Sequence, residues 1–198
     1  MIILDCEQMS DEWFAARAGI PTASNFDKIV KNDGNRSTQF QSYLNKCAAE
    51  SVAGAGESFT SDAMQRGIEL ESDARDLYQF INDVTVAEHG LIFKDENKSF
   101  SCSPDGLVGD DGGLEIKCPL PHTHVAYLRA NKLPSKYFAQ VQGSLYVTGR
   151  EWWDFMSFCP EFKPLILRVY PDAEFHAKLE KQLNDFGTLL SEIKEYIK

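Results

Sequence analysis

Apolar residues three or four positions apart, the spacing of one buried helix face, recur in several stretches of the chain. They predict helices over residues 11–18, from about 22, and over 39–50, 61–82, 135–147 and 172–197. Ser61 is placed to cap the helix that follows it. The apolar stripe of the last helix is typical of a core-facing helix, with a coiled-coil seam as the alternative.

Elsewhere apolar and polar residues alternate, which is the pattern of a strand with one buried face. Strands are predicted over 84–90, 91–95, 100–106, 112–118, 152–158 and 165–170, the first four separated by Gly- and Asp-rich turns. This order of elements indicates an α/β or α+β fold, in which helices flank a central mixed sheet. The chain has 198 residues and no linker, repeat or low-complexity tract, so we expect one domain over residues 1–198.

Composition narrows the class of protein. Hydrophobic residues make up 43% of the chain and charged residues 25%, which is typical of a globular domain. No apolar run approaches the roughly 18 residues of a membrane helix, and the first residues lack the basic and apolar regions of a secretory signal. The five cysteines are widely spread without a C-x-x-C pair, which favours a reducing compartment. We therefore expect a cytoplasmic protein without a membrane partner.

The net charge is −10, from 20 basic and 30 acidic residues. This excess of acid excludes a polycationic coat for nucleic acid, because phosphate binding needs a basic surface. It does not exclude an enzyme that binds phosphates through a few arginines and through metal ions held by carboxylates.

The sequence S-P-D-G-L, followed by L-E-I-K-C-P, carries the most informative chemistry. Because side chains alternate along a strand, Glu115 and Lys117 share one face, opposite their apolar neighbours. Asp105 is expected to end the preceding strand, and a hairpin turn then brings it near Glu115 and Lys117. Two carboxylates and an ammonium at one strand edge are typical of a Mg²⁺-dependent phosphodiester site.

Two more blocks carry candidate residues. Glu71 lies one position from the buried stripe of the helix over 61–82 and can turn inward as another carboxylate. Arg17 precedes Thr22 and Ser24, where a helix is expected to start with free N–H groups, so these residues can hold a phosphate. Each block alone also fits a structural role, as a solvated ion pair, a charged helix face or a capped helix.

In this order and spacing the blocks resemble the YqaJ-type viral recombinases, the lambda phage exonuclease family within the PD-(D/E)XK nuclease superfamily. The matching stretches are W-x-x-x-R-x-G-x-x-T-A-S at 13–24, R-G-x-x-x-E at 66–71, S-P-D-G-L at 103–107, L-E-x-K-C-P at 114–119 and A-Q-V-Q at 139–142. The resemblance extends over about residues 10–150.

The resemblance implies a PD-(D/E)XK core and a Mg²⁺-dependent 5′→3′ double-strand DNA exonuclease of phage or prophage origin, in which Mn²⁺ can replace Mg²⁺. Such an enzyme degrades one strand from a 5′-phosphorylated end and leaves a 3′ overhang for recombination by strand annealing. The roles it implies are catalysis by Asp105, Glu115 and Lys117, metal binding by Asp105, Glu115, the carbonyl of Ile116 and Glu71, and DNA or 5′-phosphate binding by Arg17, Thr22, Ser24 and Gln140.

The resemblance also implies partners. Lambda-type members form a trimeric ring around DNA and work with a phage single-strand annealing protein, so we expect a homotrimer. Its channel would carry basic residues such as Lys28, Lys31 and Arg36.

Two further positions come from the resemblance. Asp95 aligns with an acidic family position. Shortly after L-E-I-K-C-P the family places a basic residue near the DNA, where this chain has His122 and His124. This departure predicts a weaker or pH-dependent phosphate contact at that point.

Two other functions stay open. A non-catalytic DNA-end-binding module would share the fold, but such proteins usually lose a catalytic residue, and Asp105, Glu115 and Lys117 are all present. A site-specific endonuclease would share the catalytic core. The blocks at 17–24 and 66–71 favour the exonuclease over this endonuclease.

Overall fold

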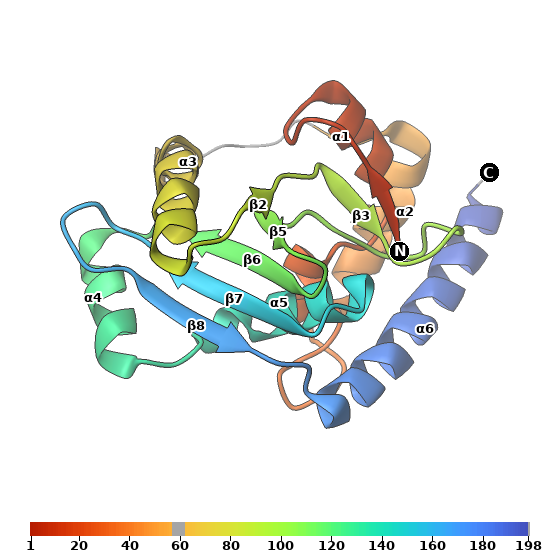
Figure 1. The fold of residues 1–198 in the computed structure, drawn as a ribbon. Coiled ribbons are helices and arrows are strands. Elements are labelled where there is room, and N and C mark those ends of the chain that lie inside the picture. The colour runs from red at the N-terminus through yellow and green to blue at the C-terminus, as the bar shows by residue number, and fades with distance from the viewer. Residues whose placement is uncertain (57–61, 198) are drawn as a thin grey trace.

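The computed structural model describes residues 1–56 and 62–197, and its strands form two sheets (Figure 1). The smaller sheet is antiparallel with the order β1-β3-β4. The larger has the order β2-β5-β6-β7-β8 and is mixed, because β6 and β7 run parallel. The strands are β1 (Ile2–Leu4), β2 (Val86–Ala87), β3 (Leu91–Phe93), β4 (Ser101–Cys102), β5 (Gly106–Val108), β6 (Gly112–Lys117), β7 (Trp152–Ser157) and β8 (Leu165–Val169).

Helices cover both faces of the larger sheet. α3 packs on the face that carries Leu114 and Ile116, and α5 covers the opposite face with Trp153 and Phe155. α3 and α4 lie at one end of this sheet, and α1, α2 and α6 lie at the other (Figure 1). The helices are α1 (Asp11–Arg17), a 3₁₀ helix (Ala23–Lys28), α2 (Phe40–Ala53), α3 (Asp62–Asn82), α4 (Pro121–Ala130), α5 (Ser135–Thr148) and α6 (Ala173–Tyr196).

This architecture confirms the expected fold class, with helices flanking a mixed sheet. The expected helices other than the second are present as α-helices close to their predicted bounds. Two elements were not expected: β1, whose three residues are too short to show a period, and α4. Pro121 starts α4 and Asn131 ends it with a left-handed backbone. The expected cap Ser61 lies outside the described residues.

Two predictions about local structure are wrong. The helix expected from about residue 22 is a six-residue 3₁₀ helix, which places Phe26 against α5 where Gly143 leaves room for its ring. The strand expected over 100–106 is divided between the two sheets: β4 belongs to the smaller one and β5 starts the next hairpin. Pro104 lies between them and, having no N–H to donate, interrupts the ladder.

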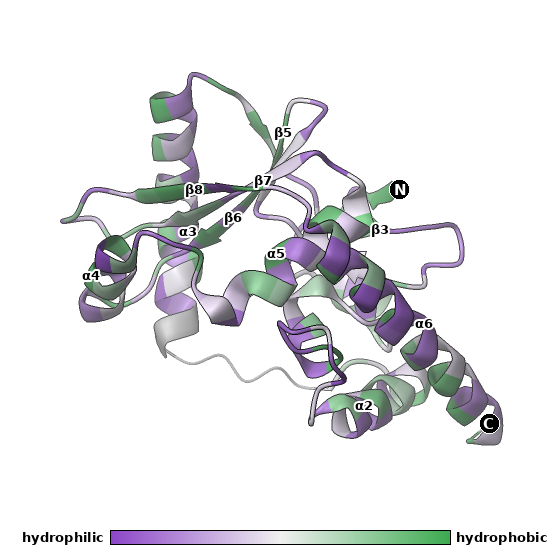
Figure 2. Ribbon diagram, turned by 90° about the horizontal axis from the view of Figure 1, so that it is seen from below, coloured by the Kyte–Doolittle hydropathy of each residue, from purple (hydrophilic) through white to green (hydrophobic). Residues whose placement is uncertain are grey.

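The apolar stripe of α6 faces the core, so the coiled-coil alternative is not needed to explain it. Phe175, Leu179, Leu183, Phe186 and Leu190 are all buried. The Phe186 ring meets the Phe40 ring of α2 edge to face, with 5.2 Å between the ring centroids. Most of the remaining positions are polar, so hydrophilic and hydrophobic segments alternate along the α6 ribbon (Figure 2).

Two expectations from composition bear on the described residues. The five cysteines are free thiols, as their spacing predicts. Within residues 1–56 and 62–197, the helices are all too short or too polar to span a bilayer.

A buried polar network fixes α3 to the larger sheet. Asp154 of β7 is 2% exposed and accepts hydrogen bonds from Nε and Nη2 of Arg168, both at 2.9 Å. Its Oδ2 also accepts from the hydroxyl of Tyr78 of α3, at 2.6 Å. Because a buried carboxylate is stable only with such partners, the network holds α3 in place along the sheet.

We predict that Arg168→Met lowers the free energy of unfolding by about 2–3 kcal/mol, because Asp154 stays buried without its counter-charge. Urea denaturation followed by circular dichroism measures this loss. The matched control is Arg36→Met, which breaks the ion pair between Arg36 and Asp185, whose side chains are 47% and 44% exposed. That exposed pair should contribute about 1 kcal/mol or less. Equal losses in the two variants would contradict the argument.

Candidate active site

The β5–β6 hairpin brings the two expected acidic residues together. Gly106 pairs with Leu114 in the antiparallel ladder, so Asp105 and Glu115 come next to each other at the end of the hairpin. Oδ2 of Asp105 accepts a hydrogen bond from the backbone N–H of Ile116, at 2.5 Å. Asp105 precedes β5 and does not end the strand before it, so that expectation is wrong, although the hairpin still delivers the carboxylate.

Glu115 and Lys117 lie on the same face of β6, as their spacing predicts. Glu115 is 1% exposed, and its Oε1 accepts hydrogen bonds from Nζ of Lys117 and, at 2.5 Å, from Nε2 of Gln140. Its Oε2 is buried and has no hydrogen-bond partner among the described residues. A buried oxygen of this kind is an open ligand position for a cation.

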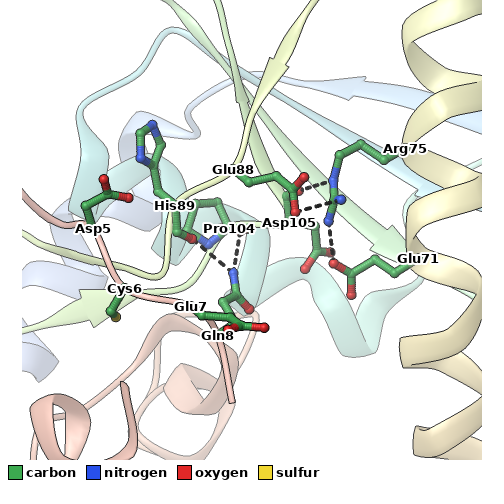
Figure 3. Close-up of a pocket in the computed structure, with 10 residues that line it drawn as sticks. All are labelled: Asp5, Cys6, Glu7, Gln8, Glu71, Arg75, Glu88, His89, Pro104 and Asp105. Carbon is green, nitrogen blue, oxygen red and sulfur yellow. Dashed lines mark hydrogen bonds and ion pairs between the residues drawn. The ribbon is translucent and has the colours of Figure 1, made fainter. Parts of the chain in front are cut away.

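Glu71 reaches the same place from α3. One helical turn further, Arg75 pairs with Glu71 through Nη2 at 2.7 Å and with Glu88 through Nη1 at 2.8 Å (Figure 3). Nε of Arg75 also donates to the backbone carbonyl of Asp105, at 3.0 Å. Sequence reasoning assigned no role to Arg75. The available signal was its position four residues after Glu71, on the same side of the helix.

The carboxylates of Glu71, Asp105 and Glu115 have too little positive charge around them to offset their burial, so their pKa values are raised. Burial, together with the repulsion of the Asp105 carboxylate, raises the pKa of Glu71 to about 7. Burial likewise raises the pKa of Glu115 to about 7, against the opposing effect of Lys117, and it also raises the pKa of Asp105. Burial alone would lower the pKa of Lys117, but the Glu115 carboxylate, and then Asp105, keep that pKa above its ordinary value. An added cation would stabilise the ionised carboxylates.

The donor set fits a divalent metal of the hard class. Asp105 and Glu115 supply carboxylate oxygens, and Oε2 of Glu115 has no other partner among the described residues. The described residues contain no preformed cluster of three or more His, Cys, Asp or Glu ligands. A third oxygen ligand from the protein would come from the backbone or from Glu71, which pairs with Arg75.

A cavity of about 710 Å³ opens onto these residues. Its lining includes Glu71, Asp105, Lys117 and, from the start of α5, Tyr137. A second cavity of about 480 Å³ adjoins it at Glu71 and Asp105, and its wall is formed by residues 5–8 (Figure 3). Nε2 of Gln8 donates to the carbonyls of His89 and Pro104 there, at 3.1 and 2.9 Å. The segment before Asp105 is thus fixed from the N-terminal side.

The expected phosphate residues Arg17, Thr22 and Ser24 do lie together. Nη2 of Arg17 donates to Oγ1 of Thr22 at 3.4 Å, and Oγ1 of Thr22 is 2.9 Å from Oγ of Ser24. The Arg17 guanidinium stacks 4.0 Å from the centroid of the Trp13 ring. It lines a cavity of about 230 Å³ together with Thr22, Tyr43 and other residues. A ligand in this cavity would be bound by side chains and not by helix N–H groups, because the 3₁₀ helix is too short to provide an N-terminal anion site.

This group is connected to the segment that precedes the hairpin through side-chain and backbone contacts. Nε1 of Trp13 donates to Oγ of Ser103 at 3.0 Å and to the carbonyl of Gly90 at 2.9 Å. Thr22 forms a parallel bridge with Ser101. Ser103 and Ser101, which make two of these contacts, lie within four residues of Asp105 along the chain.

The histidines after β6 differ from expectation. His124 is 0% exposed, and its ring nitrogens lie 2.8 Å from Oγ of Ser157 and 3.0 Å from the carbonyl of Lys163. It is therefore a structural residue and cannot make the weaker or pH-dependent phosphate contact expected at this point, which leaves His122 as the candidate. His122 is exposed on α4. Asp95 accepts from the backbone N–H of Ser99 at 3.1 Å and stabilises a turn.

Comparison with known proteins agrees with this fold. Residues 12–151 match the family model of the YqaJ-like viral recombinase domain. The alkaline exonuclease LHK-Exo from Laribacter hongkongensis is 34% identical, with a TM-score of 0.86 over 95% of this chain and 96% of that one. Its complex with dAMP is similar, at 35% identity and a TM-score of 0.85, over 96% of each chain.

A viral protein of undescribed function is also related. Uncharacterized protein R354 of Acanthamoeba polyphaga mimivirus is 28% identical over 218 residues. The alignment covers 96% of this chain and 38% of the viral protein, so the chain spans well under half the length of that relative.

Proposed function

Because the chain belongs to the YqaJ-like viral recombinase domain family, we propose that it is a metal-dependent exonuclease that digests double-stranded DNA. It degrades one strand 5′→3′ and leaves a 3′ overhang for recombination by strand annealing. The observation that carries this proposal is the meeting of Asp105, Glu115 and Lys117 at one end of the β5–β6 hairpin. The likeness to alkaline exonucleases supports a nuclease over a binding module.

The residues divide the chemistry between them. Asp105, Glu115 and the carbonyl of Ile116, with Glu71 beside them, would hold Mg²⁺, for which Mn²⁺ can substitute. When bound, the metal polarises the scissile phosphate and lowers the pKa of a water molecule. Lys117 orients the attacking water and offsets the charge that develops on the phosphate. Gln140 holds Glu115 in position through the hydrogen bond to Oε1.

We predict that Lys117→Ala digests linear duplex DNA about 10²–10⁴-fold more slowly while still binding DNA ends, because the lysine acts on the reacting groups. Release of labelled nucleotides measures the rate. Asp105→Asn should also reduce the rise in Tm that Mg²⁺ gives the wild-type protein, since metal binding stabilises the folded state. EDTA should stop digestion by the wild type.

A covalently closed plasmid, used as substrate in the same assay, distinguishes an exonuclease from an endonuclease and from a binding module. An exonuclease leaves the closed plasmid intact, an endonuclease cuts it, and a binding module digests neither substrate. Near-wild-type digestion by Lys117→Ala would contradict the assigned role. Gln41→Ala, an exposed change on α2 far along the chain from the hairpin, serves as a control and should digest normally.

We also propose that Arg17, Thr22 and Ser24 bind the 5′-phosphate of the strand to be cut. Their support is the side-chain cluster beside the cavity of about 230 Å³ and its contacts to the segment that leads to Asp105. Burial lowers the pKa of Arg17, and no carboxylate pairs with its guanidinium within ion-pair distance among the described residues. A phosphate is the ligand that such an arginine fits best.

We predict that Arg17→Ala loses the preference for 5′-phosphorylated over 5′-hydroxyl ends. The loss of one charge-assisted hydrogen bond should cost roughly 1.5–3 kcal/mol, or about 10–100-fold in the ratio of the two rates. Digestion rates of matched duplexes with either end give this ratio. Arg17→Lys tests whether charge alone suffices. A variant Arg17→Ala that keeps the full preference would show that the arginine serves the structure only.

The wider biology follows from the family. We propose that the chain originates from a phage or prophage, acts in the bacterial cytoplasm and delivers its overhang to a phage single-strand annealing protein. We propose further that it works as a homotrimeric ring. A ring retains DNA mechanically, which suits a chain of net charge −10 that binds DNA poorly through charge alone.

We predict a mass of about three times the chain mass of 22.3 kDa in light scattering. The ring should also continue digesting a bound duplex after an excess of competitor DNA is added, because a closed ring cannot release its strand. A monomeric mass at micromolar concentration, with digestion that stops at once on adding competitor, would refute the ring. Such a protein would be a distributive nuclease.

A further inference from the structure

Lys136, in the first turn of α5, lines the cavity of about 710 Å³ that Glu71, Asp105 and Lys117 also line. Arg75 and Lys117 line it too, but Arg75 is paired with Glu71 and Glu88, and Lys117 is paired with Glu115. Among the described residues, no carboxylate lies within ion-pair distance of Lys136. Its charge is therefore available to a ligand in the cavity.

Two tyrosines hold the Lys136 side chain in place. Its Nζ lies 4.7 Å from the centroid of the Tyr137 ring and 5.7 Å from that of Tyr127. Hydrogen bonding to Tyr127 raises the pKa of Lys136, so the ammonium stays charged. Tyr137 is itself fixed against Phe155 of β7, with 5.3 Å between the ring centroids. A lysine ordered in advance loses less side-chain entropy when it binds an anion.

The position of Lys136 relative to Lys117 indicates which anion Lys136 would contact. Nζ of Lys117 lies 5.5 Å from the centroid of the same Tyr137 ring. Both ammonium groups therefore lie within 6 Å of one ring centroid. Successive phosphates along a DNA strand rise by about 3.4 Å. A strand whose scissile phosphate lies at Lys117 thus carries a second phosphate within reach of Lys136.

We propose that Lys136 binds a backbone phosphate neighbouring the scissile phosphodiester on the strand that is cut. This step rests on the proposed nuclease function and adds a strand-positioning contact to it. The contact exists before and during cleavage, so it contributes to binding of the substrate and the transition state alike. Such a contact lowers KM and leaves kcat unchanged.

The test compares Lys136→Met with two other variants. Lys136→Arg keeps the charge. Lys132→Met is the matched control, because Lys132 is an exposed lysine four residues earlier that does not line the cavity. Binding of a linear duplex is measured by fluorescence anisotropy in EDTA, where no cleavage occurs, over a series of salt concentrations. Digestion kinetics with Mg²⁺ are measured in parallel.

We expect Lys136→Met to reduce the slope of log K against log salt by about 0.9, the contribution of one phosphate contact. Its KM should rise about tenfold with kcat unchanged. Lys136→Arg should restore both quantities, and Lys132→Met should match the wild type. An unchanged slope and KM in Lys136→Met, or equal changes in Lys132→Met, would overturn the proposal.

The binding arm separates this inference from the proposed function. If the wild type binds duplex DNA with the lysine-dependent slope but digests none, the nuclease function fails and the phosphate contact stands. If the wild type digests DNA and Lys136→Met has a normal slope, the nuclease stands and the inference fails. A wild-type protein that neither binds nor digests DNA would overturn both.

Discussion

The burial of acidic side chains beside the β5–β6 hairpin is the constraint on which the site depends. A carboxylate that loses its water is stable only if donors or cations replace it. Glu115, at 1% exposure, is supported by Lys117 and Gln140, and Asp105 by the N–H of Ile116. These donors come from β6 and α5, so the sheet and the helix beneath it must both be in place before the acidic site can form. The candidate site is thus a consequence of the completed core.

The same constraint explains the place of α3. Arg75 contacts Glu71, Glu88 and the backbone carbonyl of Asp105. Glu71 belongs to α3, Glu88 to the segment before β3, and Asp105 to the segment after β4. Tyr78, about two turns after Glu71 on the same helix, donates to Asp154 and fixes the helix to β7. α3, which carries Glu71 as the third carboxylate, is therefore fixed at two places. The ion pairs of Arg75 fix it at the site, and the buried network of Tyr78 and Asp154 fixes it in the core.

Local patterns in the sequence were sufficient for the part of the site that one hairpin determines. The alternation of side chains on one strand placed Glu115 with Lys117, and the turn between the strands delivered Asp105. Helical periodicity likewise found α3 and α6, because one apolar face is enough to define each. These features depend on residues close together in the chain, which is why the sequence could predict them.

The rest depends on contacts between distant residues. No local pattern shows that the chain leaves one sheet at Cys102 and joins the other at Gly106, nor that Glu88 meets Arg75. His124 illustrates the same limit, because its partners Ser157 and Lys163 lie more than 30 residues away. The family resemblance suggested a phosphate contact at this point, and only the packed structure shows a buried ring with two hydrogen-bond partners instead.

The distribution of cations decides how an acidic chain can act on DNA. Three cations form ion pairs within the protein, and each pair supports a buried or half-buried carboxylate. They are Arg75, Lys117 and Arg168. These three charges are therefore not free to attract a phosphate backbone, and a net charge of −10 opposes any general attraction. The cations without carboxylate partners within the described residues include Arg17 and Lys136, and both border cavities. If both bind phosphate as proposed, contact with DNA is concentrated at a few positions near the two cavities, an arrangement that suits a strand end held at the cleavage site better than a duplex bound along its length.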